Sequence, residues 1–230
     1  MQMARFIKFW KENSRGETFI TKDDLMTTLL RIDASARVED SYSRQLGDSF
    51  EASWRTRHPS GAVVRRDLAR APIPQITSET IAGFYTPAEA MTDALRDATS
   101  LSDALIGELQ AADALLVTTP MYNFGIPAAL KAWVDQIVRI GRTFSYDGAN
   151  FTGLVTGKPV TIAIAYGAGG YGEGGPLAAL DLVRPYLATL FGFLGFTEIR
   201  LMGVEATTGD PHTLETALDA ARTAIAALAV

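Results

Sequence analysis

Short apolar runs alternate with amphipathic segments along this chain, and this alternation constrains the fold more than any other feature. Segments with helical spacing separate five apolar runs, at residues 26–33, 61–69, 113–120, 160–167 and 196–206. The runs are apolar throughout, as expected for strands that helices cover on both faces of a sheet. The pattern therefore predicts a parallel α/β sheet with right-handed crossovers.

Five parallel strands in one domain favour a doubly wound sheet over a barrel, with the flavodoxin-like strand order 2-1-3-4-5. We assign residues 26–230 to this domain and residues 1–25 to an N-terminal extension of unknown role. The predicted helices lie at residues 42–59, 100–112, 126–141, 177–195 and 210–230.

Residues near the ends of these elements refine the prediction. Ser100 or Ser102 is expected to cap the helix at residues 100–112, and Gly141 to end the next one. The Pro-bearing connection of residues 70–99 is interpreted as part loop and part helix. Residues 142–159 are expected to form a hairpin excursion, with turns at Asp147-Gly148 and at Gly157.

Composition and charge exclude several classes of function. The chain has no cysteine, which excludes disulfides, thiolate nucleophiles and cysteine-based metal sites, and its histidines, His58 and His212, lack ligand spacing. We therefore expect no metal. A net charge of −5 argues against a nucleic-acid partner. No apolar run reaches the roughly 20 residues of a membrane span, and no signal peptide is recognisable, so a cytoplasmic protein is expected.

Ligands of such a sheet bind beyond the carboxyl ends of its strands, close to the switch point between strands 1 and 3. The segment after the first strand offers the hydroxyls of Ser35, Ser41 and Ser43, with Arg37 and Arg44 nearby. Free N–H groups at the start of the following helix attract anions, so this segment predicts a phosphate site. The alternative is that Ser41 simply caps the helix.

Large side chains follow the third strand, in "PMYNFG", where small polar residues would be usual for a turn. Met121, Tyr122 and Phe124 could cover a flat apolar ring, while Asn123 and the N–H groups of the turn meet its polar edge. The alternative is a hydrophobic plug over the core.

A glycine-rich segment, "GAGGYGEGG", follows the fourth strand, and it would let the backbone approach a ligand closely. The alternative is a flexible surface loop. Together the three segments predict a site with phosphate at one end and a flat heteroaromatic ring at the other, which fits non-covalently bound FMN.

Four stretches, "ASARVEDSYSRQL", "PMYNFGIPAALKAWVDQIVRIGRTF", "GLVTGKP" and "DLVRPYLATLFGFLGF", resemble the FMN-dependent NADH:quinone oxidoreductases, also called FMN-dependent NADH-azoreductases. The resemblance covers about residue 27 to the C-terminus. It implies that the phosphate and ribityl end contacts Ser35, Ser41, Tyr42 and Ser43. The flavin ring would contact Met121, Tyr122, Asn123 and Phe124, and its pyrimidine side Gly167, Ala168, Gly169 and Gly170. The family commonly carries Ser-x-Gly-Gly in this last loop, so Gly167-Ala168 lacks a hydroxyl contact.

The resulting hypothesis is a flavoenzyme that passes two electrons from NADH or NADPH to quinones, and also cleaves azo compounds, in a ping-pong cycle. Backbone donors of Gly169 and Gly170 would stabilise the negative charge of the reduced flavin around N1 and O2. No side chain is assigned as a general acid, because the chemistry belongs to the cofactor. Two alternatives remain open, namely a flavodoxin-like electron carrier and a non-enzymatic flavin-binding sensor.

Surplus apolar surface predicts a homodimer whose flavin sites are partly closed by the other chain. Trp133 lies on an apolar helical stripe, and "PYLATLFGFLGF" puts apolar residues all round its helix. Phe144 and Tyr146 of the predicted hairpin extend beyond the sheet, where they could cover a flavin face. The resemblance also implies a dimer.

Overall fold

A five-stranded parallel sheet forms the centre of the structure, which is a computed structural model that describes residues 27–228. Its strands, in the order in which they lie side by side, are β2 (Ala62–Asp67), β1 (Thr28–Asp33), β3 (Ala114–Pro120), β6 (Pro159–Ala165) and β7 (Glu198–Val204). The labels differ from the expected order 2-1-3-4-5 only because the hairpin strands β4 and β5 are counted before β6. The topology is the predicted one.

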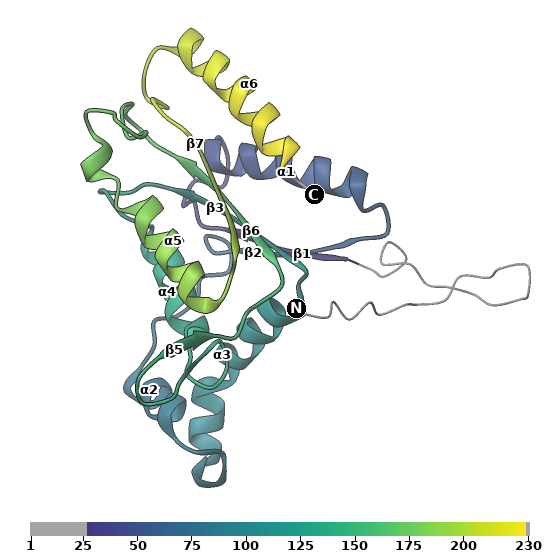
Figure 1. Ribbon diagram of the computed structural model, residues 1–230, viewed down its shortest axis with the longest axis vertical. Coiled ribbons are helices and arrows are strands. Elements are labelled where there is room, and N and C mark those ends of the chain that lie inside the picture. The colour runs from purple at the N-terminus through teal and green to yellow at the C-terminus, as the bar shows by residue number, and fades with distance from the viewer. Residues whose placement is uncertain (1–26, 229–230) are drawn as a thin grey trace, which may run out of the picture.

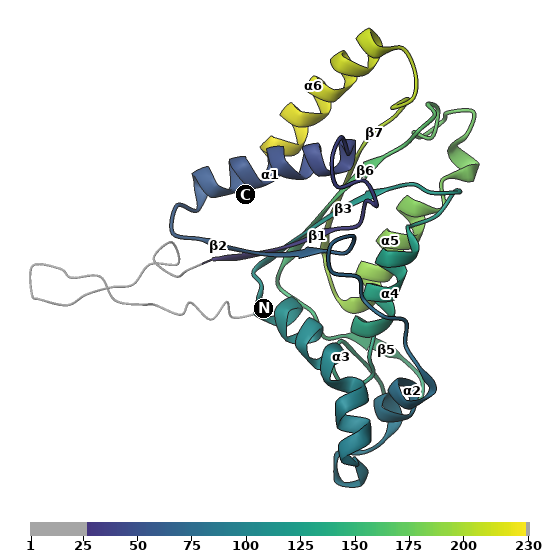
Figure 2. The same ribbon diagram turned by 180° about the vertical axis from the view of Figure 1, so that it is seen from behind.

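Helices cover both faces of the sheet. The helices α1 (Tyr42–Arg57) and α6 (Pro211–Ala227) lie on one face, and α3 (Asp93–Ala111), α4 (Ala128–Ile137) and α5 (Val183–Leu194) lie on the other (Figure 1), an arrangement that Figure 2 shows from behind. Side chains alternate between the two cores: Leu115 and Val117 of β3 pack with Trp133 of α4, while Leu116 packs with Trp54 of α1. This alternation explains the apolar residues of the central strands β3 and β6. The expectation of strands that are apolar throughout was wrong for the others, because β1 buries the charged Arg31 and Asp33, and β2, at the edge of the sheet, exposes Val64 and Arg65.

The helix expected at residues 100–112 begins earlier, as α3. Thr92, not Ser100 or Ser102, precedes α3, and its hydroxyl accepts the N–H of Leu95 at 3.3 Å. Ser102 lies inside the helix, where its hydroxyl donates to the carbonyl of Gln136 in α4 at 2.6 Å. A serine that finds such a partner need not mark a helix start, which is why the predicted cap was wrong. The rest of the 70–99 connection contains α2 (Ser78–Tyr85) and a short 3₁₀ helix (Ala88–Ala90).

Two other helices are shorter than predicted. The helix α4 ends at Ile137, and Gly141, with φ of +74°, belongs to the turn that leads to the hairpin instead of ending the helix. The segment predicted as one helix from residue 177 is a 3₁₀ helix (Ala178–Leu180) followed by α5. Asp181 separates the two, because its carboxylate accepts the first N–H groups of α5, from Val183 at 2.9 Å and Arg184 at 3.1 Å.

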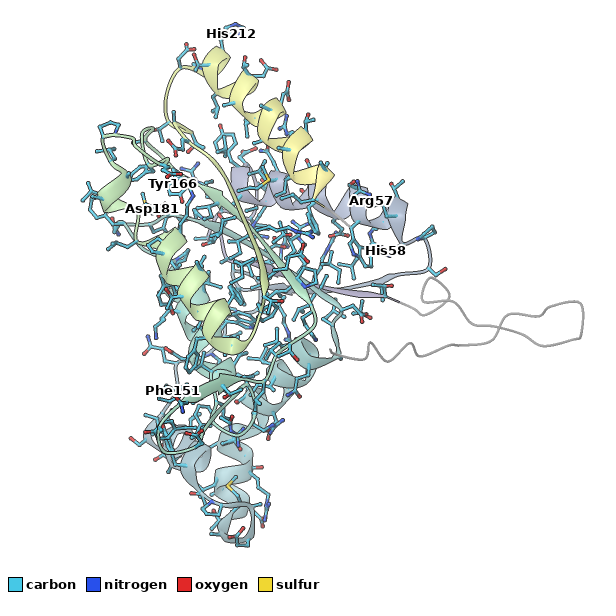
Figure 3. All side chains as sticks on the ribbon, viewed as in Figure 1. Arg57, His58, Phe151, Tyr166, Asp181 and His212 are labelled. Atoms are coloured by element: carbon cyan, nitrogen blue, oxygen red, sulfur yellow. The ribbon has the colours of Figure 1, made fainter. Side chains whose placement is uncertain are left out.

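The predicted hairpin is confirmed as β4 (Phe144–Tyr146) and β5 (Phe151–Gly153), with Gly148 in its turn at φ of +99°. It packs against the C-terminal end of α5, where the N–H of Val155 donates to the carbonyl of Leu194 at 2.8 Å. Figure 3 shows the labelled Phe151 at one end of α5 and Tyr166 and Asp181 at the other. The hairpin, which forms a separate two-stranded sheet, therefore lies far from the carboxyl edge of the five-stranded sheet.

Within residues 27–228, no helix is both long enough and apolar enough to cross a membrane.

Candidate functional site

A cavity of about 240 Å³ opens at the carboxyl edge of the sheet, where β1, β3 and β6 end side by side. Its lining is formed by Ser35, Arg37, Asp40, Ser41, Tyr42, Pro120, Met121, Tyr122, Ala165, Gly167, Thr207 and Thr208. The cavity thus brings together residues from all three segments that the sequence singled out. Because neighbouring strands are spaced by about 4.8 Å, these segments follow one another over roughly 10 Å along the edge.

The first segment presents hydroxyls at the start of α1. Ser41 is the N-cap residue, but its side chain makes no capping hydrogen bond, and its Oγ lies 3.3 Å from Oγ of Ser43 instead. The first turn of α1 contains no acidic residue. Its N–H groups and the positive end of the helix dipole are therefore not neutralised by a cap, which favours an anion there over the alternative of simple capping.

The two arginines of this segment do different things. Arg37 lines the cavity, and its N–H donates to Oγ of Ser35 at 3.2 Å. Arg44 points to the neighbouring strand, where it binds Asp67 with two hydrogen bonds and donates to the carbonyl of Ser35 at 2.9 Å. The bond from Arg44 lowers the pKa of Asp67 to about 2. Arg44 thus joins the loop to β2 and does not line the cavity. Ser43 is fully buried and does not line it either.

The second segment is a tight turn with unusual residues at its tip. The N–H and carbonyl groups of Tyr122 and Gly125 bond to each other at 2.9 and 3.0 Å, which encloses Asn123 and Phe124. Both enclosed residues have positive φ, +49° and +71°, as in a type I′ turn. Asn tolerates this conformation, but Phe does not, and strain of this kind clusters at functional sites.

The exposed side chains of this turn explain its composition. Phe124 is 48% exposed and Tyr122 is 38% exposed, so the turn is not a plug over the core. Met121 and Tyr122 line the cavity, whereas Asn123 and Phe124 lie beyond its lining. The turn therefore places Tyr122 in the lining of the cavity and holds the strained Phe124 exposed, two residues further along the chain.

The third segment is held by the neighbouring strand. Gly167 lines the cavity, Ala168 and Gly169 are exposed, and Gly170 has φ of +93°. The N–H of Gly170 donates to Oε2 of Glu205 at 2.7 Å, so it is not free to meet a flavin as expected. For the N–H of Gly169, no acceptor is recorded among the residues that the structure describes.

Sequence reasoning missed Thr207 and Thr208, which follow β7 and line the cavity. Their hydroxyls donate to the carbonyls of Tyr166 and Gly167, both at 2.9 Å, and their N–H groups donate to the same carbonyls at 3.1 Å. The rule for doubly wound sheets predicts the site at the first and third strands and says nothing of the edge strand. The polar "TTGD" turn after the last strand is the signal that could have revealed them.

The arrangement fits the group that the sequence suggested. Hydroxyls and a helix start suit a phosphate, exposed aromatic side chains suit a flat ring, and a glycine loop suits the approach of a ring edge. These features occur in the same order along the sheet edge as the parts of FMN. Among residues 27–228, no group of His, Asp or Glu side chains is arranged to hold a metal ion, and His212 is exposed near the start of α6 (Figure 3).

Comparison with known proteins gives consistent results. Residues 27–229 match a family described by a flavodoxin-like fold. A protein of Xanthobacter autotrophicus named FMN-dependent NADH:quinone oxidoreductase is 62% identical over 176 residues, which cover 76% of this chain and 85% of that protein. A protein of the same name from Nostoc punctiforme is 43% identical over 189 residues, which cover 82% of this chain and 92% of that one.

A solved structure extends the comparison to three dimensions. The crystal structure of an azoreductase from Bacillus anthracis str. Sterne is similar with a TM-score of 0.81 and 28% sequence identity. The similarity covers 89% of this chain and 99% of the azoreductase.

Proposed function

Because this chain belongs to the flavodoxin-like family of FMN-dependent NADH:quinone oxidoreductases, we propose that it transfers two electrons from NADH to quinones through bound FMN. The proposal extends to the reductive cleavage of azo compounds, which the similarity to an azoreductase supports. The observation that carries it is the cavity in which the segments after β1, β3 and β6 meet.

The chemistry that FMN supplies when bound is two-electron transfer, and the protein supplies binding and orientation. We assign the phosphate and ribityl end to Ser35, Ser41, Tyr42 and Ser43, the ring to Met121, Tyr122, Asn123 and Phe124, and the pyrimidine side to Gly167, Ala168, Gly169 and Gly170. Of these residues, Ser35 and Ser41 have hydroxyls at the cavity, and Ser43 contributes through its contact with Ser41. No side chain is assigned as a general acid.

The aromatic side chains of the 121–125 turn would shield the reacting face from water. Tyr122 lines the cavity, and Phe124 is exposed in the same turn. A flat nicotinamide or quinone could stack between such a side chain and the flavin ring, because rings prefer offset stacked or edge-to-face contacts. This placement would give both substrates the same binding face, so that they would bind in turn in a ping-pong cycle.

The test uses the full-length protein reconstituted with flavin. Denaturation and chromatography should release FMN at up to one per chain. Anaerobic NADH should bleach the flavin absorbance, and a benzoquinone or an azo dye should restore it. Release of FAD, failure to bind any flavin, or a bound flavin that NADH does not reduce would overturn the proposal.

We also propose that the active form is a homodimer. Trp133 does not support this idea, because it is fully buried in the core of one chain. The support comes from an apolar groove of about 650 Å³ between α4 and the start of α5, which is lined by Gly125, Ile126, Lys131, Leu182, Pro185, Tyr186 and Thr189. A second copy of the chain could bury this groove symmetrically.

The hairpin supports a site shared between two chains. Its residues Tyr146 and Phe151 are 47% and 62% exposed. The hairpin packs at the C-terminal end of α5, whereas the glycine-rich loop lies toward the N-terminal end, and a helix of 12 residues is about 18 Å long. The hairpin is thus badly placed to cover the flavin of its own chain, but it could cover that of a partner.

The division of the chain stays a prediction, because residues 1–25 lie outside the described residues. We propose that they form an extension that the FMN-binding domain of residues 26–230 does not need. Removing them should leave solubility and FMN content unchanged. A cytoplasmic location remains part of the proposal, and cell fractionation would test it.

A further inference from the structure

Glu205 lies one residue beyond β7, and its carboxylate binds the glycine-rich loop that follows β6. A single oxygen, Oε2, accepts the N–H of Gly170 at 2.7 Å and that of Tyr171 at 3.1 Å. Both donors belong to the loop that the proposed function places beside the pyrimidine side of FMN. From this geometry we infer that Glu205 is a positioning residue of the flavin site, an inference that rests on the proposed function.

Glu205 is itself held in place by Arg184, close to the start of α5. Nη2 of Arg184 lies 3.9 Å from Oε1 of Glu205, and Nη1 of Arg184 donates to the carbonyl of Tyr171 in the loop at 3.3 Å. The guanidinium also lies 4.8 Å from the ring centre of Tyr166 and donates to Oδ2 of Asp181 at 3.1 Å. The space for it exists because β7 has Gly203, where a Cβ atom would lie 2.9 Å from Nη2.

Tyr166 and Asp181, which are labelled near each other in Figure 3, both contact Arg184. The Tyr166 hydroxyl is buried and donates to Oδ2 of Asp181 at 2.9 Å. Burial raises the pKa of Tyr166, so this hydroxyl stays a donor at any ordinary pH. The Tyr166 ring also stacks on that of Tyr171, at 5.1 Å between ring centres. Arg184, which these groups hold, therefore lies beside both the Glu205 carboxylate and the loop.

The loop depends on this anchor because its own shape is demanding. Gly170 has φ of +93°, and its carbonyl accepts the N–H of Leu177 at 2.9 Å, which closes the loop on itself. The carbonyl of Gly170 also lies so close to Gly175 that a Cβ atom there would be 2.3 Å away. A peptide in this conformation needs partners for its N–H groups, and Glu205 provides one for two successive residues.

The consequence is a loop that is ordered before the ligand arrives. The N–H of Gly170, which we expected to meet the flavin, instead fixes the path of residues 167–171, so that other groups of this loop can face the ring edge. Without the anchor, binding a flavin would also have to order this backbone, and that cost would reduce affinity. The loop lacks the hydroxyl of the Ser-x-Gly-Gly pattern, and an anchor from β7 would compensate by holding the backbone.

The experiment compares substitutions of Glu205 that separate the length of its side chain from its charge. Glu205→Ala removes the acceptor, Glu205→Asp keeps the charge but withdraws it by one methylene, and Glu205→Gln keeps an oxygen at the same distance. Glu198→Ala is the matched control, because Glu198 begins the same strand, far from the loop, and pairs with Arg200. Each protein is tested without flavin and is then titrated with FMN and with riboflavin.

We expect Glu205→Ala and Glu205→Asp to bind both flavins about tenfold more weakly, the order expected when hydrogen bonds to a charged acceptor are lost. Glu205→Gln should stay within about threefold of the original protein, and Glu198→Ala should not differ from it. In the flavin-free proteins, the amide protons of Gly170 and Tyr171 should exchange faster in the Ala and Asp variants than in the Gln variant, as measured by NMR.

Several outcomes would overturn the inference. The first is that Glu205→Ala and Glu205→Asp both keep the original flavin affinity and amide protection. The second is that the variants bind FMN more weakly but riboflavin as before. The third is that Glu205→Gln binds flavin more weakly although its amides remain protected. If Glu205→Ala does not fold, the comparison of Asp with Gln decides. Failure of the unsubstituted protein to bind any flavin would contradict the proposed function instead, so the two failures are distinguishable.

Discussion

Arg44 in α1 and Asp67 in β2 are joined by two parallel hydrogen bonds, from Nη1 to Oδ2 at 2.7 Å and from Nη2 to Oδ1 at 2.8 Å. Because Arg44 also donates to the carbonyl of Ser35, this pair connects the proposed phosphate loop to the neighbouring strand. A bidentate pair of this kind fixes geometry as well as charge. The loop therefore receives its position from a contact that lies outside the cavity.

The first prediction concerns the acid sensitivity of this pair. The pKa of Asp67 is about 2 in the folded protein against an ordinary 3.8, so the carboxylate stabilises the fold above about pH 4 and loses this effect as the pH falls through 2. A shift of this size corresponds to about 2 kcal/mol. Asp67→Asn should lower the free energy of unfolding by about that amount at pH 7 and by much less near pH 2.

Denaturant unfolding at several pH values measures this difference. The control is Asp219→Asn, because Asp219 forms an exposed pair with Arg222 that should contribute little. A deficit in Asp67→Asn that is the same at pH 7 and pH 2 would show that the charge of Asp67 is not its cause.

A second prediction tests the phosphate end of the site. Ser41→Ala should weaken FMN by about 5- to 10-fold, the effect of losing one hydrogen bond to a charged group, and should leave riboflavin binding nearly unchanged. Fluorescence titration with both flavins measures the two affinities. Ser49→Ala is the control in the same helix, because the Ser49 hydroxyl bonds to the carbonyl of Gln45. Equal losses for FMN and riboflavin would contradict the phosphate assignment.

The strained turn gives a third prediction. Phe124→Asn should raise the free energy of unfolding of the flavin-free protein by about 0.5–1 kcal/mol, because Asn tolerates the positive φ of this position better than Phe does. The same change should weaken flavin binding or slow quinone reduction, since it removes an exposed aromatic side chain from the turn whose Met121 and Tyr122 line the cavity. Tyr122→Asn is the control, because Tyr122 is not among the residues of positive φ, and it should bring no gain in stability. A Phe124→Asn variant that is no more stable would argue against strain.

A fourth prediction concerns the assembly. Leu182 is 57% exposed and lines the apolar groove, so Leu182→Glu should place a charge in the proposed dimer interface and produce monomers. Light scattering should give about 24.8 kDa for this variant and twice that mass for the original protein. Val64→Glu, on the edge strand β2, should leave the mass unchanged. An original protein that is monomeric and fully active at assay dilution would exclude a shared site.

Local sequence patterns were sufficient for the strands and for the loops that follow them. Each predicted run corresponds to a strand, and the central strands β3 and β6 are apolar at nearly every position because helices cover both of their faces, which a single run displays by itself. Helix ends were less predictable. Ser102 has the chemistry of a cap, yet it lies inside α3, since its hydroxyl finds the carbonyl of Gln136 in another helix. No local pattern contains that information.

The sequence by itself determined the parallel sheet, its strand order, and which three segments meet at its carboxyl edge, because these properties follow from periodicity and from the rules of chain connection. Only the tertiary structure decided how those segments are held. Glu205 reaches Gly170 because β7 lies beside β6, and Arg44 reaches Asp67 because α1 packs close to the end of β2. Such contacts join residues that are distant in the chain, so they depend on how neighbouring elements are packed and aligned. The local sequence around one residue does not identify the partner that lies in another segment.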